Sequence, residues 1–149
     1  MNKQLALEPT GKVTVLSVSP HDEDHLSLQA IIDHSRWEMF AARDLSSALS
    51  LLQKHNISVL LCERDLVPGT WSDLLEYVNA LTNPPLLIVA SRVADDRLWA
   101  EALNLGAWDV LAKPLDRTEV IRSVYSAWLR RYDQSQMRAT AVKVMEAAS

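Results

Sequence analysis

The stretch Gly106-Ala107-Trp108-Asp109-Val110-Leu111-Ala112-Lys113-Pro114 decides the fold of this chain. Its glycine suits the end of a helix, and the apolar residues that follow are typical of a short strand. A charged residue, Lys113, follows this strand. A second apolar run, Val59-Leu60-Leu61-Cys62, also ends in charge, at Glu63. If the two strands are parallel neighbours, a carboxylate and an ammonium group meet at one edge of a sheet.

The rest of the chain alternates between two kinds of pattern. Apolar and β-branched runs predict five strands, at residues 13–18, 37–41, 57–62, 86–90 and 108–112. Apolar residues at helical spacing separate them, and the expected helix ends are Asp44, Ser72, Asp95 or Asp96, and Gly106. This alternation predicts an α/β fold, a doubly wound parallel sheet with helices on both faces. Ligand chemistry in such a sheet lies beyond the carboxyl ends of the strands.

Composition limits the classes of function. The chain has 149 residues, 48% of them hydrophobic, which favours one globular domain. A formal net charge of -4 gives no general attraction to nucleic acid or to an anionic membrane. The single cysteine, Cys62, lies in an apolar run, and no continuous apolar stretch resembles a signal peptide. We therefore expect a cytoplasmic protein without nucleic-acid or membrane partners.

Three segments are expected along the chain. Residues 1–11 form an N-terminal leader, residues 12–131 a single domain, and residues 132–149 a C-terminal extension. The extension carries Met137, Ala141, Val144 and Met145 at helical spacing. Two interpretations stay open: the extension continues the last helix and packs on a partner, or it is a frayed terminus.

Over residues 12–131 the chain resembles the receiver domains of two-component response regulators. Residues 59–69, 86–91 and 106–114 carry the resemblance, and the pattern Gly-Ala-x-Asp-x-Leu-x-Lys-Pro in the last of them is the most specific. The resemblance implies a flavodoxin-like fold with strand order 2-1-3-4-5. It also implies a role in phosphorelay signal transduction, as a binding module and not as an enzyme.

The resemblance further implies a phosphorylation site, but most residues of that site are replaced in this sequence. In receivers, two acids after the first strand and an acceptor aspartate bind Mg²⁺, while a lysine, a hydroxyl and an aromatic residue respond to the phosphoryl group. The equivalent positions here are Ser19 and Pro20 for the acids, Glu63 for the acceptor, Ala90 for the hydroxyl, Val110 for the aromatic residue and Lys113 for the lysine. Only the lysine matches. We therefore expect a degenerate receiver, or pseudo-receiver, that needs neither phosphate nor Mg²⁺.

Several alternatives remain at this edge of the sheet. The pair of Glu63 and Lys113 is either purely structural or a permanent mimic of the active state. An unorthodox phosphoacceptor, Asp65 or Asp22, with a rearranged Mg²⁺ site is the competing function. Substitute acids for that site are Asp22, Glu23, Asp24 and Asp65. His21 and His25 have a spacing that suits a transition metal, but a third ligand is missing. Ser91 should point to the other side of its strand.

The last two main helices have more apolar residues than one buried stripe requires. The candidate interface residues are Leu98, Trp99, Leu105, Tyr125 and Trp128. They predict a protein partner, such as a histidine kinase or another regulator, or a homodimer through these helices. A nucleotide or small-molecule site at the strand ends is the weakest reading, because no glycine-rich phosphate loop is present.

Overall fold

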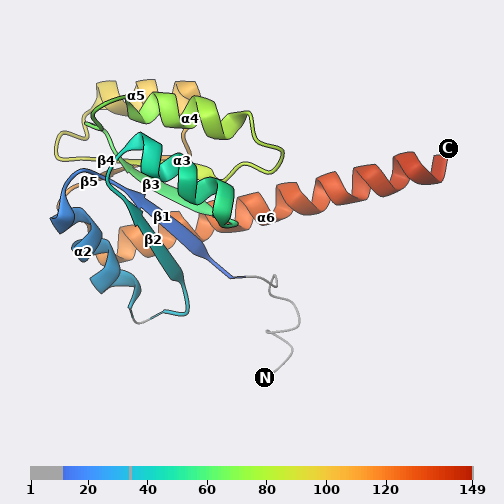
Figure 1. Ribbon diagram of the computed structural model, residues 1–149, viewed down its shortest axis with the longest axis horizontal. Coiled ribbons are helices and arrows are strands. Elements are labelled where there is room, and N and C mark those ends of the chain that lie inside the picture. Colours follow the sequence, from blue (N-terminus) through green and yellow to red (C-terminus); the bar gives the residue numbers. More distant parts are fainter. Residues whose placement is uncertain (1–11, 34, 149) are drawn as a thin grey trace.

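The computed structural model describes residues 12–33 and 35–148, in which strands and helices alternate (Figure 1). The elements are β1 (Thr14–Val18), α2 (Asp22–Ile32), β2 (Glu38–Ala42), α3 (Leu45–Lys54), β3 (Val59–Glu63), α4 (Trp71–Asn79), β4 (Leu86–Ser91), α5 (Asp96–Leu105), β5 (Asp109–Ala112) and α6 (Arg117–Ala148). All five strands lie close to their predicted positions. The predicted leader at residues 1–11 falls outside the described residues.

The five strands form one parallel sheet in the order β2-β1-β3-β4-β5. This confirms the predicted doubly wound fold and its strand order. In the register of the sheet, Val18 lies beside Cys62 and Glu63 lies beside Ala90. The carboxyl ends of β1, β3 and β4 therefore meet at one edge of the sheet, next to the end of β5.

Helices cover both faces of the sheet, and each face has its own apolar core. Alternate residues of the strands, such as Leu60 and Val89, pack against α3, α4 and α5. Their neighbours, such as Leu61 and Ile88, pack against α2 and α6. Figure 1 shows α4 and α5 at the top of the view and α2 at its lower left, while α6 runs behind β1 and β2. Because both faces are covered, the central strands are apolar at nearly every position.

The helix ends follow local rules, with one correction. Asp44 and Asp95 cap α3 and α5 by accepting backbone N–H groups, and Gly106 ends α5 in the left-handed region, with φ of 106°. Ser72, expected to cap α4, lies inside that helix instead. The cap is Thr70, whose hydroxyl accepts the Asp73 N–H at 3.1 Å, while the Asp73 carboxylate accepts the Thr70 N–H at 3.0 Å. This reciprocal pair satisfies two helix-end donors, which Ser72 cannot do.

The last helix, α6, is the longest element, with 32 residues. It passes the expected boundary after residue 131 without a break, so the extension continues the last helix. Beyond the sheet it projects away from the domain, as the orange and red end in Figure 1 shows. Every residue from 136 to 148 is exposed. No helix among the described residues is long and apolar enough to cross a membrane.

Candidate functional site

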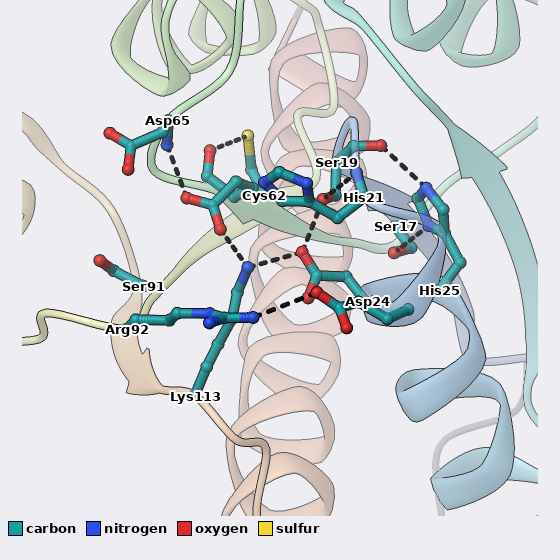
Figure 2. A network of polar contacts seen from close by, with 12 residues as sticks. Ser17, Ser19, His21, Asp24, His25, Cys62, Asp65, Ser91, Arg92 and Lys113 are labelled. Carbon is teal, nitrogen blue, oxygen red and sulfur yellow. Dashed lines mark hydrogen bonds and ion pairs between the residues drawn. The ribbon is translucent and has the colours of Figure 1, made fainter.

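Lys113 is the centre of a buried polar network at the carboxyl edge of the sheet. It follows β5, and its Nζ donates to Oε1 of Glu63, the last residue of β3. The same Nζ donates to Oδ2 of Asp24, in the first turn of α2, at 2.5 Å (Figure 2). The exposed fractions of the three side chains are 8% for Lys113, 6% for Glu63 and 17% for Asp24. One ammonium group thus holds two carboxylates in a largely dry setting.

Glu63 has a partner for each carboxylate oxygen. Oε1 accepts from Lys113, and Oε2 accepts from the backbone N–H of Asp65 at 2.6 Å. The methylene that distinguishes glutamate from aspartate lets the carboxylate reach over the β3 turn to this N–H group. Both oxygens of this buried carboxylate accept a hydrogen bond. Removing Lys113 would leave Oε1 without its donor and the carboxylate without its counter-charge.

Asp24 joins α2 to the network. Its Oδ2 also accepts from the hydroxyl of Ser19, at 2.6 Å, and Ser19 Oγ in turn accepts the N–H of His21 at 3.1 Å. Burial by itself raises the pKa of Asp24. The hydrogen bonds from Lys113 and Ser19, with the charge of Lys113, outweigh burial and bring the pKa of Asp24 below its ordinary value.

The Lys113 ammonium is shifted in the opposite direction. Burial by itself lowers the pKa of Lys113, but hydrogen bonds to Asp24 and Glu63, together with their charges, outweigh it. The pKa of Lys113 therefore lies above its ordinary value. Both shifts favour the charged forms, so Asp24 and Lys113 are both ionised across the neutral range.

His25 fixes the start of α2 against the end of β1. Its Nε2 lies 2.9 Å from the Ser19 carbonyl oxygen, which can only accept, so Nε2 carries a proton. Its Nδ1 lies 2.8 Å from the Ser17 hydroxyl. Both ring nitrogens are thus engaged within the chain. Among the described residues, no group of three His, Cys, Asp or Glu side chains is placed to hold a metal ion, and the predicted pairing of His21 with His25 gains no third ligand.

Three of the four substitute acids named for a rearranged metal site do not pair with Lys113. Asp22 pairs with Arg43, and Glu23 pairs with Arg92 at 3.1 Å; both acids are mostly exposed. Asp65 contributes its backbone N–H, while its carboxylate points away from Lys113 in Figure 2. Asp24 is the acid that enters the site. Its position as the third residue of α2 is the available signal, because a side chain there reaches back over the helix start.

The remaining mapped positions surround or border the network. Ala90 lies beside Glu63 in the register and lines, with Lys113, a void of about 10 Å³. Ser91 turns to the other side of β4, as strand alternation predicts, and its hydroxyl accepts the N–H of Val93 at 3.0 Å. Val110 is buried in the core against α3, α4 and α5. The Pro20 carbonyl oxygen accepts a hydrogen bond from Arg43 at 3.1 Å.

Two of the five candidate interface residues belong to the core. Leu98 is only 3% exposed and Trp128 only 7%, because they face the sheet from α5 and α6. Trp99, Leu105 and Tyr125 are exposed. Trp99 and Leu105 lie on α5 and Tyr125 on α6, the helices that pack on opposite faces of the sheet. Leu103, an exposed apolar residue four positions after Trp99, was not predicted.

Cys62 shows how dry the neighbouring core is. The thiol is buried beside Glu63, and its burial, followed by the negative charge of Glu63, raises its pKa to about 12. A thiol with so high a pKa stays protonated and unreactive at neutral pH. It behaves as a small apolar residue of the core.

Known proteins resemble this chain in fold and sequence. The curated protein-glutamate methylesterase/protein-glutamine glutaminase of Photorhabdus laumondii is 33% identical over 107 residues, which are 70% of this chain and 31% of that protein. The chain thus spans less than a third of the length of this relative.

Solved structures show the same fold at lower identity. The signal receiver domain of an HD domain-containing protein from Pseudomonas fluorescens superposes with a TM-score of 0.77 at 22% identity, covering 85% of this chain and 94% of that one. The signal receiver domain of a putative Luxo repressor protein from Vibrio parahaemolyticus has a TM-score of 0.78 at 17% identity, with coverages of 85% and 98%.

The family model of the response regulator receiver domain matches residues 15–125, from the second residue of β1 into α6. This match covers the sheet except for Thr14, together with every residue of the Lys113 network. The chain therefore belongs to the response regulator receiver domains, which act in signal transduction, in general as non-enzymatic modules that interact with kinases and regulators.

Proposed function

We propose that this chain is an atypical receiver that signals in the cytoplasm by binding a protein partner, independently of phosphorylation. The observation that carries the proposal is the double contact of Lys113 with Glu63 and Asp24. The positive charge at this edge of the sheet is supplied by the chain itself. A receiver whose site is already neutralised in this way has no need of Mg²⁺ or of a phosphoryl group.

The donor set supports a site without Mg²⁺. Mg²⁺ requires oxygen ligands in tight octahedral geometry. Glu63 offers both oxygens to N–H donors, and Oδ2 of Asp24 accepts from Lys113 and Ser19. A cation would have to break these bonds and displace a buried ammonium group. The residues described here therefore do not fit a Mg²⁺ ion.

The space beside Glu63 supports the same conclusion. The void lined by Ser19, Glu63 and Ala90 measures about 10 Å³, roughly the room for one water molecule. A phosphoryl group has four heavy atoms, which is more than this void holds. In addition, the longer glutamate side chain places its oxygen about one bond length from where an aspartate would, and in-line transfer tolerates little displacement.

The network also suggests what the site does in place of phosphorylation. It connects α2, β3 and the segment after β5, so it keeps the carboxyl edge of the sheet in one arrangement. Trp99 and Leu103 are exposed apolar residues of α5. They are four positions apart, so they lie on one side of that helix. We propose this side of α5 as the contact for a protein partner, such as a histidine kinase or another regulator, without nucleic acid or membrane.

Treatment with acetyl phosphate and Mg²⁺, followed by intact-mass spectrometry, tests the proposal. The expected result is an unchanged mass, under conditions in which an ordinary receiver with an acceptor aspartate gains one phosphoryl group. A phosphoryl adduct on the native chain would overturn the proposal. Asp22→Asn and Asp65→Asn variants would then identify the acceptor if the competing function, an unorthodox phosphoacceptor, were correct.

Calorimetric titration with Mg²⁺ gives an independent test. We expect no saturable heat for the native chain. Saturable binding that disappears in Asp65→Asn or Asp22→Asn would favour the rearranged metal site. The outward directions of Asp22 and Asp65 argue against that outcome.

A further inference from the structure

The end of α6 projects from its own domain and carries exposed apolar residues. Residues 136–148 are exposed around the whole circumference, and Met137 and Val144 are 66% and 62% exposed. This segment spans more than three turns, and an isolated helix of such length is marginal in water. Its apolar residues would gain stability from a second surface. The question is which surface fits.

Four apolar residues, though not Val142 or Met145, follow the spacing of a two-stranded coiled coil. Met137, Ala141, Val144 and Ala148 recur at intervals of four, three and four residues. These intervals place Ala141 and Ala148 at the a positions of heptads, and Met137 and Val144 at the d positions. Gln134, the preceding a position, is half-buried where α6 leaves the domain.

The line of these residues, called here the seam, does not face the domain. Val124 is buried against the sheet, and Arg131 and Arg138 donate to the Asn83 carbonyl and side-chain oxygens, so this line marks the side of α6 that faces its own domain. One residue advances about 100° around a helix, so the seam lies roughly a quarter of a turn away. A second helix can lie on the seam while the domain stays beside it.

The charges beside the seam are complementary to those of a second copy. In this register Asp133 takes a g position and Arg138 the e position of the next heptad, five residues later. In parallel two-stranded coils, g of one helix faces this e of the other. Two Asp133–Arg138 pairs would therefore form across the two-fold axis. In an antiparallel pair, g faces g and e faces e, which brings like charges together.

The rest of the segment raises no barrier to self-association. Asp133 and Glu146 balance Arg138 and Lys143, so the four charges cancel. Arg138 uses Nη1 to donate to Asn83 at 3.1 Å, which leaves its other guanidinium nitrogens for Asp133 of a second copy. Lys143 and Glu146 take the outward c and f positions.

We propose that residues 133–148 of two copies form a parallel two-stranded coiled coil, which makes the protein a homodimer. The interface is isologous, because each copy contributes the same residues. It is separate from the Lys113 network, so the proposal does not depend on whether the receiver is phosphorylated. The two domains are held by their C-terminal helices, which leaves α5 of each copy open to a protein partner.

Sedimentation equilibrium of the full chain over a range of concentrations tests the dimer. The native chain is expected to approach twice the mass of 16.7 kDa, and the Met137→Glu/Val144→Glu variant to remain a monomer. Lys143→Glu, an outward position of the same helix, is the matched control and should dimerise like the native chain. Far-UV circular dichroism verifies that the domain of each variant is folded. A monomeric native chain, or a Met137→Glu/Val144→Glu variant that still dimerises, would overturn the proposal.

Charge reversal tests the register. Asp133→Arg replaces two attractive contacts by two repulsive ones and should raise the dimer dissociation constant about tenfold. The double variant Asp133→Arg/Arg138→Asp restores opposite charges and should recover most of this loss. If the double variant is weaker than the single one, the register is wrong.

Crosslinking tests the direction of the helices. In the parallel arrangement, residue 148 of one copy lies opposite residue 148 of the other. Mild oxidation of an Ala148→Cys variant should therefore yield a covalent dimer, whereas the outward Lys143→Cys variant should yield little. Equal crosslinking of both variants, or none at position 148, would contradict the parallel coil. Buried Cys62 does not compete for the oxidant.

Discussion

Side chains at the carboxyl edge of the sheet and at the far end of α6 differ in their burial and in their contacts within the chain. At the edge, Lys113, Glu63 and Asp24 are buried and are partnered within the chain. Along α6 beyond residue 135, apolar and charged residues alike are exposed. The edge is therefore a closed site, whereas the helix end is an open surface. Partnered side chains thus gather at the edge of the sheet, and exposed ones along the end of α6.

The largest effect should come from removing the ammonium group from the closed site. Lys113→Met leaves Glu63 and Asp24 buried without their shared cation, and breaking a buried ion pair from one side costs about 3–5 kcal/mol. We expect the free energy of unfolding, measured by urea denaturation, to fall by that amount. Lys12→Met, which breaks the exposed pair with Glu38, is the matched control and should cost at most about 1 kcal/mol. Equal losses in the two variants would show that the network is not closed.

A smaller effect should follow from Asp24→Asn, and it should depend on pH. A hydrogen bond to a charged group contributes about 1.5–3 kcal/mol, so the variant should lose about 2 kcal/mol at pH 7. The pKa of Asp24 is lower in the folded protein than its ordinary value of 3.8. Its contribution is therefore complete well above pH 3.8 and is lost as the pH falls through the folded pKa.

The unfolding free energies of native protein and Asp24→Asn should thus converge in acid. At the basic end, the raised pKa of Lys113 means that its contribution is complete below 10.5 and is lost as the pH rises through the higher folded value. Asp22→Asn, on the exposed pair with Arg43, should change stability by no more than about 0.5 kcal/mol at any pH. A gap between native protein and Asp24→Asn that does not narrow as the pH falls below 3.8 would show that the carboxylate charge is not the cause.

The smallest expected effect is a difference between the two regions in how their amide hydrogen-exchange rates depend on protein concentration. Backbone amides of β3 and β5, next to the closed site, should exchange slowly at every protein concentration. Amides of residues 139–148 should exchange rapidly in dilute protein and more slowly as concentration rises, because a second copy covers them. Mass spectrometry of peptic fragments measures both regions in one sample. Protection of residues 139–148 that does not change with concentration would contradict an intermolecular cover.

The closed site was predictable in outline but not in its membership. Glu63 and Lys113 each end or follow an apolar strand, and the rule that parallel strands end at a common edge brings them together. Asp24 lies among three consecutive acids, Asp22 to Asp24, and nothing in their chemistry distinguishes them. Their directions depend on the residue at which α2 begins, a one-residue detail that sequence patterns do not define.

The candidate interface residues show that the sequence also leaves open which side of a helix is buried. Trp99 and Leu98 are adjacent and both apolar, so composition cannot say which of them faces the sheet. In the fold, Leu98 packs with Ala102 against the sheet and Trp99 is 39% exposed. Trp128 likewise lies on the buried side of α6, between the rings of Tyr125 and Tyr132, with centroids 5.8 and 5.9 Å away. A shift of about 100° per residue separates core from surface.

The order of the elements, the parallel sheet and the meeting of a carboxylate with a lysine could all be inferred from the amino-acid sequence, because periodicity and strand ends are local properties. The fold was needed to see that Asp24 completes the network, that Glu63 accepts a hydrogen bond from the turn after its own strand, and that α6 continues beyond the domain with residues 136–148 exposed. These depend on helix phase and on distances between elements. Such distances are set by packing of the whole chain, which no short stretch of residues contains.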